Sequence, residues 1–311
     1  MTDPVNRSVS TDSLFYDEQL ARAVKRFQQR HGLEVDGRIG RSTLNALNIS
    51  VSDKIKMIEL NLERLRWLPK NYGREYLLVN IPEYKLRAYQ KSKLSLVMGV
   101  IVGKEYTSTP VFCDTLRYLV FSPTWTVPHS IKSEEMLPRL QRDSSYYSGK
   151  NYKFYKGWHT DQEIEPSLVD WSQYSIDHFP FNVVQQPGPG NALGLVKFIM
   201  PNNHSIYLHD TPTDHLFERT ERALSHGCIR LEEPALLAQY LLRDQKSWDI
   251  NKILAAMHKD EPERVYFKKN YHVQLTYLTS FVDEFGLINF RDDIYGHDRA
   301  QMTEINTIAL K

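Results

Sequence analysis

Hydrophobic residues follow two different periods along this chain. Between positions 17 and 65 they recur every three or four residues, which predicts amphipathic helices. The first of these helices is expected to end at His31-Gly32, because glycine suits the position just after a helix. Its apolar stripe consists of Leu20, Ala23, Val24 and Phe27.

Two more helices are expected before position 70. A short one covers 44–47 and is capped by Ser42-Thr43. A longer one runs from Lys54 to about Leu65 and stops before Pro69, because proline cannot continue a helix. Its expected buried stripe consists of Ile55, Ile58, Leu62 and Leu65.

From position 75 the hydrophobic period changes to two, which is the period of a half-buried strand. Turn signals such as Ser108-Thr109-Pro110 and Ser122-Pro123 separate the alternating runs. Short strands at this spacing predict a β-sandwich or a closed sheet. The expected strands are 76–81, 85–89, 94–102, 118–121, 195–200, 206–209, 273–279 and 288–291, with helices at 235–242 and 250–257.

The strand pattern breaks between 129 and 178. Ser133 can cap a helix that contains Glu134 and Glu135, and the rest of the segment is irregular and rich in aromatic residues. Two interpretations are open: a lid over a functional site, or a long structured loop that only extends the core. The aromatic residues are Tyr146, Tyr147, Tyr152, Phe154, Tyr155, Trp158 and Trp171.

Composition adds limits on the class of protein. The chain has 311 residues, 41% of them hydrophobic, which is enough for a sizeable core. A net charge of +1 gives no sign of bulk nucleic-acid binding or of a membrane-surface field. No apolar run reaches the length of a transmembrane helix, and residues 1–13 are polar, unlike a signal peptide, and are expected to be loosely attached.

The segment Ser225-His226-Gly227-Cys228-Ile229-Arg230-Leu231 holds the strongest candidate chemistry. A cysteine reacts as its thiolate and therefore needs a nearby base. His209 lies at the end of a predicted strand and can serve as that base. Gly227 allows a close backbone approach, so that N–H groups beside it could hold an oxyanion. The residues alone also permit a structural thiol at Cys228 and a core histidine at 209.

The combination of His209-Asp210 with the Ser-His-Gly-Cys box resembles the active-site signature of the L,D-transpeptidase (YkuD-like) catalytic domain, which builds and edits bacterial peptidoglycan. The run from Ala23 to Leu47, with its DG-x-x-G-x-x-T-x-x-AL core, resembles a three-helix peptidoglycan-binding domain. Whether that module binds glycan or only packs against its neighbour stays open. The chain as a whole is similar to the large Gram-negative members of the family.

The resemblance implies an α+β fold. A small all-α peptidoglycan-binding-like domain is expected at 14–50 and a helical connector at 51–72. A mostly β catalytic sandwich is expected at 73–298, with a lid or capping insertion at 129–178.

The resemblance also implies roles for individual residues. Cys228 is the expected nucleophile and His209 the expected base. Ser225, His226, Gly227 and Arg230 are expected to support the site and its oxyanion, while Trp125, Tyr207 and Arg230 are expected to contact substrate. No metal and no cofactor are expected, since two cysteines and unpaired histidines form no metal-binding pattern.

Two neighbours of the site need separate arguments. Asp210 is adjacent to His209 on a strand, so the two side chains point to opposite faces and a backbone carbonyl is the better orienting partner. Arg230 could bind a substrate carboxylate, or it could form a structural ion pair with Glu232 or Glu233. We favour the substrate role for Arg230.

The implied reaction is formation of 3-3 cross-links between meso-diaminopimelate residues through a cysteine acyl-enzyme, with release of D-alanine. The alternatives are an L,D-carboxypeptidase that hydrolyses the same bond and a non-catalytic peptidoglycan-binding protein. A lid favours transfer over hydrolysis because it excludes water.

Expected partners are peptidoglycan stem peptides and other cell-wall synthases, but no nucleic acid. Carbapenems are expected to acylate Cys228. The expected location is the periplasm, with an export signal outside this sequence. Cys113 and Cys228 are expected to be free thiols, with Cys113 structural.

Overall fold

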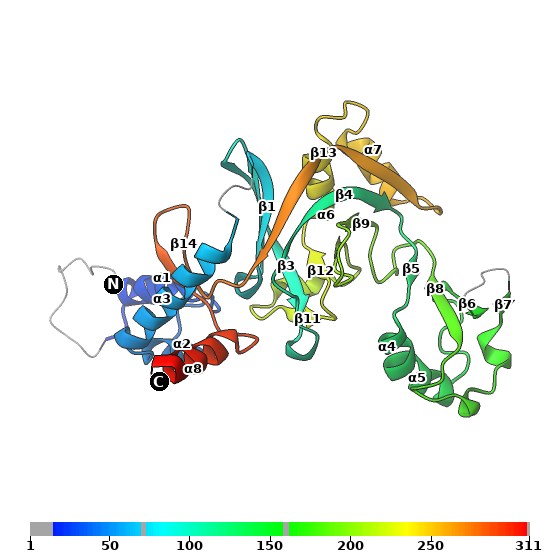
Figure 1. Ribbon diagram of the computed structural model, residues 1–311, viewed down its shortest axis with the longest axis horizontal. Helices are drawn as coiled ribbons and strands as arrows, with labels where there is room; N and C mark the ends of the chain where they lie inside the picture. Colours follow the sequence, from blue (N-terminus) through cyan, green and yellow to red (C-terminus); the bar gives the residue numbers. More distant parts are fainter. Residues whose placement is uncertain (1–14, 70–72, 158–161, 310–311) are drawn as a thin grey trace.

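The computed structural model describes residues 15–69, 73–157 and 162–309. Figure 1 shows three parts in a row: helices at one end, a large sheet in the middle, and a smaller subdomain at the other end. This arrangement confirms the predicted α+β fold with helices ahead of a mostly β domain. The expectation for residues 1–13 lies outside the described residues, and the domain boundaries stay predictions.

The helical module contains α1 (Glu18–Arg30), α2 (Arg41–Leu47) and α3 (Val51–Trp67). Asp17 caps α1, because its side chain accepts a hydrogen bond from the backbone N–H of Leu20. The expected cap of α2 at Ser42-Thr43 was wrong. Gly40 occupies the N-cap of α2 without a side-chain bond, and Ser50 caps α3 by accepting from the N–H of Asp53.

The expected buried stripe of α3 was also wrong. Ile55, Leu62 and Leu65 are 50%, 51% and 45% exposed, whereas Asn61 and Arg64 are buried. The reason is that α3 packs on polar partners near the C-terminus. Asn61 exchanges hydrogen bonds with Thr279, and the Arg64 guanidinium contacts the Asp298 carboxylate at 2.6 Å.

Nine strands form the central sheet, in the order β11-β3-β12-β10-β9-β4-β13-β1-β2. An additional pairing joins β2, at one end of this order, to β3, the second strand from the other end, and closes the sheet on itself. The strands are β1 (Glu75–Asn80), β2 (Lys85–Gln90), β3 (Lys93–Gly103), β4 (Cys113–Phe121), β9 (Val196–Ile199), β10 (Leu208–His209), β11 (Ala223–Ser225), β12 (Ile229–Leu231) and β13 (Glu263–Thr276).

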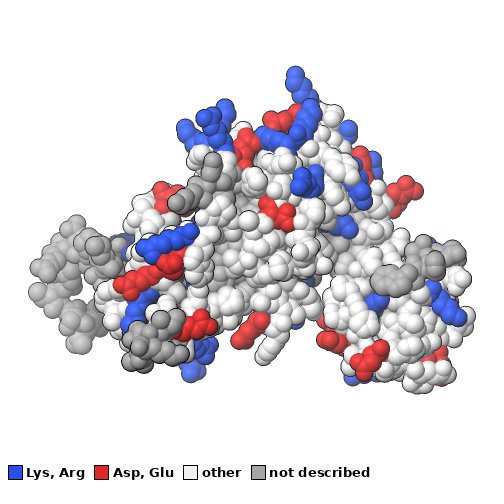
Figure 2. All heavy atoms as spheres, viewed as in Figure 1, with Lys and Arg blue, Asp and Glu red and all other residues white. Residues whose placement is uncertain are grey.

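The core of this domain lies between the sheet and two helices, α6 (Pro234–Leu242) and α7 (Ile250–Met257). Leu77, Leu119 and Phe198 are fully buried there. Short turns connect the strands: η1 (Ile81–Glu83), η2 (Glu105–Thr107) and η6 (Asp214–Glu218). Acidic and basic side chains are interspersed over the face shown in Figure 2.

The segment expected to be an irregular insertion forms a subdomain with its own sheet and core. The sheet has the order β5-β8-β6-β7, and the two adjacent strands β5 and β8 come from residues beyond 129–178. Trp171, Phe154 and Phe181 pack together in its core. Its elements are β5 (Trp125–Thr126), α4 (His129–Ile131), the π-helical turn η3 (Lys132–Met136), α5 (Leu137–Arg142), β6 (Tyr152–Lys156), β7 (Glu163–Ile164), η4 (Pro166–Leu168), η5 (Trp171–Gln173) and β8 (Phe181–Gln185).

Ser133 does not cap a helix in this subdomain, as had been expected. It lies inside η3, and its hydroxyl donates to the carbonyl of His129 at 2.9 Å. The helical path from 129 to 142 is therefore continuous across Ser133.

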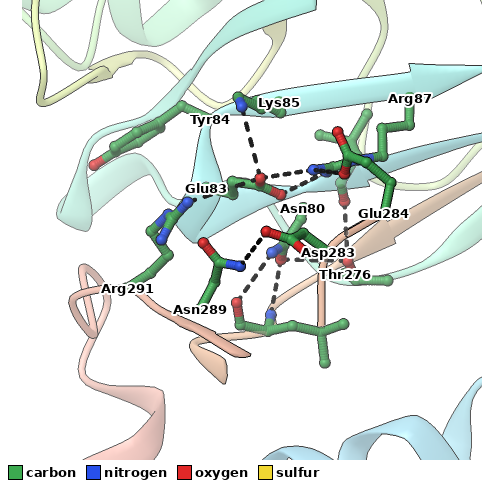
Figure 3. A network of polar contacts seen from close by, with 12 residues as sticks. Asn80, Glu83, Tyr84, Lys85, Arg87, Thr276, Asp283, Glu284, Asn289 and Arg291 are labelled. Atoms are coloured by element: carbon green, nitrogen blue, oxygen red, sulfur yellow. Dashed lines mark hydrogen bonds and ion pairs between the residues drawn. The ribbon is translucent and has the colours of Figure 1, made fainter. Parts of the chain in front are cut away.

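The C-terminal elements return to the helical module. They are β14 (Ser280–Val282), β15 (Ile288–Phe290) and α8 (His297–Ala309). Arg291 donates to the carbonyl of Arg30, and Arg30 donates to the carbonyl of Ile288, both at 2.9 Å. Figure 3 shows how Arg291 also approaches Glu83, which is held by two hydrogen bonds from Arg87. The module is thus fastened to the sheet through buried charges. Within the described ranges, no helix has the length and apolar character needed to cross a membrane.

Candidate active site

Cys228 lies in the short connection between β11 and β12, near the middle of the molecule in Figure 1. The connection is held from both sides. The Ser225 hydroxyl donates to the carbonyl of Cys228 at 2.6 Å, and the Thr109 hydroxyl donates to the carbonyl of Gly227 at 2.8 Å. Gly227 has φ of +111°, which a side chain would disfavour. This turn therefore presents the thiol in a fixed position.

In this geometry the backbone N–H of Gly227 is not available for the expected oxyanion role. Its N–H donates to the Ser225 hydroxyl at 3.1 Å and is not free for a ligand. The backbone N–H groups of His226 and Cys228 have no acceptor within the described structure. Ser225 thus acts as a clamp on the turn, and these two N–H groups are the available donors.

Cys228 is half-buried. Its thiol lies 3.7 Å from the carbonyl oxygen of Ser205, and it receives hydrogen bonds from the backbone and the side chain of Tyr207. Burial raises the pKa of Cys228, while the Tyr207 hydrogen bonds and the Arg230 charge hold it down. The resting thiol is therefore protonated at neutral pH and needs a base to react.

His209 ends β10 and is 4% exposed. Its Nδ1–H donates to the backbone carbonyl of Asp210 at 2.5 Å, which leaves Nε2 as the proton acceptor. Burial, reinforced by the charges of Arg230 and Lys197, lowers the pKa of His209 to about 3. The imidazole is thus neutral at physiological pH, as a general base must be.

Asp210 does not orient the imidazole through its carboxylate. That carboxylate accepts from the N–H groups of Leu195 and Thr211, both at 2.7 Å. The backbone carbonyl is the partner of His209, in agreement with the strand argument.

The strand register brings Cys228 and His209 to one face of the sheet. β10 and β12 are parallel neighbours, with Leu208 opposite Ile229 and His209 opposite Arg230. The Tyr207 ring lies 5.6 Å from the His209 ring and also contacts Cys228. Among the described residues no hydrogen bond joins Cys228 to His209. The hydrogen bond that the thiol donates goes to the Ser205 carbonyl.

Arg230 faces the same site. Its Nη1 donates weakly to the Thr213 hydroxyl at 3.4 Å, and its Nε is buried without a partner within the described structure. It forms no ion pair with Glu232 or Glu233, and Glu232 instead accepts from the N–H of Gly99. A half-buried guanidinium with an unused donor is suited to a carboxylate ligand.

Two contacts connect the site to the neighbouring subdomain. The side chain of Trp125, on β5, hydrogen-bonds to Tyr207 and also packs against the subdomain core. His226 Nε2 lies 2.7 Å from the Glu135 carboxylate on η3. Sequence reasoning missed Glu135 and Thr109, because nothing near them in the chain indicates a long-range partner.

Both cysteines are free, as expected, but Cys113 is exposed at the start of β4 and is not a packed structural thiol. Across the described residues no three histidine, cysteine or carboxylate side chains gather in a way that could hold a metal ion.

Comparison with known proteins identifies the class to which this fold and site belong. The family described as "L,D-transpeptidase catalytic domain" (YkuD) matches residues 74–250, and a "Putative peptidoglycan binding domain" matches residues 8–47. A Haemophilus influenzae protein named "Putative L,D-transpeptidase" is 35% identical over 257 residues. The chain belongs to the L,D-transpeptidase family.

The alignment with the Haemophilus protein covers 82% of this chain but only 51% of that relative, so the chain spans about half its length. Solved structures of L,D-transpeptidases are more distant. One from Mycobacterium smegmatis is 12% identical, covers 65% of this chain and 58% of its own, and has a TM-score of 0.31. Another, an Ldtfm-avibactam carbamoyl enzyme, is 12% identical, with coverage of 66% and 49% and a TM-score of 0.30. The family assignment rests on the domain match and the Haemophilus relative.

Proposed function

We propose that this protein is a peptidoglycan L,D-transpeptidase that works through an acyl-enzyme on Cys228. The observation that carries the proposal is the grouping on one sheet face of a thiol, a neutral buried imidazole and a guanidinium with an unused donor. These are a nucleophile, a base and an anchor for a carboxylate. The location that fits this substrate is the periplasm or cell wall.

In the first half-reaction, His209 Nε2 accepts the thiol proton and the thiolate attacks the carbonyl of an L-centre in a stem peptide. The N–H groups of Cys228 and His226 receive the oxyanion. The imidazolium then protonates the departing amine as the peptide bond breaks, and D-alanine leaves. A thioester on Cys228 remains.

In the second half-reaction, the side-chain amine of diaminopimelate on another stem peptide attacks the thioester. His209 takes a proton from this amine and returns one to the sulfur, so that a 3-3 cross-link forms and the free thiol is restored. The subdomain that carries Trp125 and Glu135 lies next to the Cys228 thioester. By excluding water it favours attack by the amine over hydrolysis. Hydrolysis by water at the same step is the competing L,D-carboxypeptidase reaction.

The test is mass spectrometry after incubation with a disaccharide-tetrapeptide bearing meso-diaminopimelate, with wild type and Cys228→Ala side by side. Cross-linked dimers and free D-alanine from wild type alone are the expected result. Tripeptide without dimer would establish the carboxypeptidase instead. A mass adduct with a carbapenem on Cys228 is also expected, because the strained lactam carbonyl acylates a thiolate. No product and no adduct would leave only a peptidoglycan-binding protein.

A further inference from the structure

A second cleft, of about 1130 Å³, opens between the helical module and the catalytic domain. Cys228, His209 and Arg230 are not among the residues that line it. Its walls come from five segments: residues 29–35 at the end of α1 and beyond it, residues 82–85 around η1, residues 218–224, residues 291–294, and Glu105 in η2. The third segment leads directly into Ser225 and the cysteine turn, so the cleft and the active site share one loop.

Two arginines give the cleft fixed walls. Arg222 donates to the carbonyls of Val100, Arg219 and Tyr84, which ties the 218–224 loop to the sheet. Arg291 donates to the carbonyl of Arg30 and approaches Glu83 at 3.8 Å (Figure 3). These contacts occupy the guanidinium groups in holding the walls.

The Arg291 side chain also passes directly over Gly32. An added Cβ at Gly32 would come within 2.6 Å of the Arg291 side chain. The junction is therefore built for close contact between the module and the sheet.

With the two arginines counted, six carboxylates and four basic side chains line the cleft, which leaves it net acidic. Five carboxylates line it without forming an ion pair to any described residue. Against them stand Lys85, which lies 4.0 Å from the buried Glu83, and Arg219. The five are Glu34, Glu105, Glu218, Glu221 and Asp292.

Glu221, Asp292 and Tyr84 line this cleft together. Burial and the Glu221 charge raise the pKa of Asp292, with the Arg291 charge opposing, and burial and Glu221 also raise the pKa of Tyr84. Tyr84 is itself fixed, with φ of +57° and its ring 5.4 Å from the Arg222 guanidinium. A cationic group placed here would relieve the repulsion between the two carboxylates.

We propose that this cleft is a second peptidoglycan subsite, which binds the free side-chain amine of a stem peptide that is not being processed at Cys228. Glu221 and Asp292 receive the amine, with the Tyr84 hydroxyl beside them. The ligand class rests on the proposed function. Residues 29–35, which line one wall, lie within the segment that matches a peptidoglycan-binding domain. A polymeric strand held in the cleft is then kept close to the cysteine turn.

The test measures binding of the Cys228→Ala protein to purified sacculi by co-sedimentation, so that turnover does not enter. Adding Glu221→Gln and Asp292→Asn is expected to weaken binding about tenfold, through loss of two charge-assisted contacts. The matched control carries Asp260→Asn and Glu261→Gln, which remove the same charge from an exposed loop away from the cleft. Acetylating the free amines of the sacculi is expected to weaken binding of the parent protein to a similar degree.

Equal binding by the cleft variant and the control would overturn the inference, and so would binding that is insensitive to acetylation or absent in the parent. Circular dichroism of both variants confirms that they fold. The transpeptidase assay with the soluble disaccharide-tetrapeptide, run on the cleft variant with Cys228 intact, is expected to match wild type. Loss of that activity in wild type itself would count against the proposed function, whereas the sacculus assay tests the cleft alone.

Discussion

At the scale of single residues, the reactivity of Cys228 depends on which groups hydrogen-bond to its sulfur. Tyr207 supplies hydrogen bonds that favour the thiolate, and burial opposes them. The aromatic ring therefore does more than line the site. It sets how readily the thiol ionises before any substrate arrives.

Tyr207→Phe is expected to raise the pKa of Cys228, because the side-chain hydrogen bond to the thiolate is lost. Alkylation by iodoacetamide at pH 7.5 should then slow by roughly three- to tenfold, the scale of one hydrogen bond to a charged group. The measurement uses a Cys113→Ser background, since Cys113 is exposed and would also react. Tyr266→Phe, on the outer surface, is the control, and equal rates in both variants would contradict the assignment.

The neutral state of His209 also predicts how stability depends on pH. Its pKa is lowered from 6.5 to about 3, so between these values the unfolded chain binds a proton that the folded chain does not. The contribution of His209 to the free energy of unfolding is therefore fully present above about pH 6.5. This contribution is lost progressively as the pH drops toward 3. His31, with its pKa lowered to about 4, contributes in the same direction.

Urea unfolding at pH 7 and pH 4.5 measures this effect. The decrease in unfolding free energy between the two pH values should be smaller in His209→Gln than in wild type by about 3 kcal/mol, because pH 4.5 lies two pH units below 6.5 and each unit is worth about 1.4 kcal/mol for one proton. His272→Gln, which changes an exposed histidine, should leave the decrease unaltered. An equal loss in all three proteins would show that His209 is not the group responsible.

At the scale of elements, α3 shows why sequence periodicity misled. Its apolar residues at 55, 62 and 65 are half exposed, while the polar Asn61 and Arg64 are buried beside Leu60. Burial of a polar side chain requires specific partners, and those partners lie more than two hundred positions away. No local sequence pattern predicts such a pairing. The apolar stripe was therefore predicted as the buried face of α3, and this prediction was wrong.

A matched pair of substitutions tests this interpretation of α3. Asn61→Ala should lower the free energy of unfolding by about 2–4 kcal/mol, because Thr279 and Met57 lose their hydrogen-bond partner in a buried place. Leu62→Ala, on the half-exposed side, should cost less than about 1 kcal/mol. Urea denaturation of the two variants provides the comparison, and the reverse ranking would restore the apolar stripe as the packing face.

The main strands and the cysteine motif were accessible from sequence for different reasons. Alternation in the central sheet is a local property and gave most strands close to their observed bounds. The cysteine, its glycine and the distant histidine were recognised by motif and spacing. The position of Tyr207 on the thiol, and the use of the Gly227 N–H within the turn, depend on strand register and could not be read from the chain.

At the scale of the whole molecule, the small subdomain contacts the cysteine turn through His226 and Glu135. This contact spans two parts of the protein that each have a separate core. It therefore holds the subdomain against the site without belonging to either core.

Glu135→Gln should loosen this contact and admit water to the acyl-enzyme. The ratio of cross-linked dimer to hydrolysed tripeptide is expected to fall several-fold, while the rate of acylation by a carbapenem stays within about twofold. Mass spectrometry of the products gives the ratio. Glu134→Gln alters the adjacent exposed carboxylate and serves as the control; a similar ratio in both variants would count against a closing role for the contact.

The return of the last elements to the first ones also constrains how the protein acquires its structure during synthesis. Arg64 is made early, yet its buried partner Asp298 and the Thr279 that holds Asn61 are made near the end. Until they emerge, the face of α3 that carries Arg64 and Asn61 lacks these two partners to pack against. The first helices therefore do not form a stable, independently folded domain before the rest of the chain is made. They become stably packed only when the last elements have been synthesised. In a ribosome-stalled fragment that ends before residue 279, these helices should therefore be sensitive to protease.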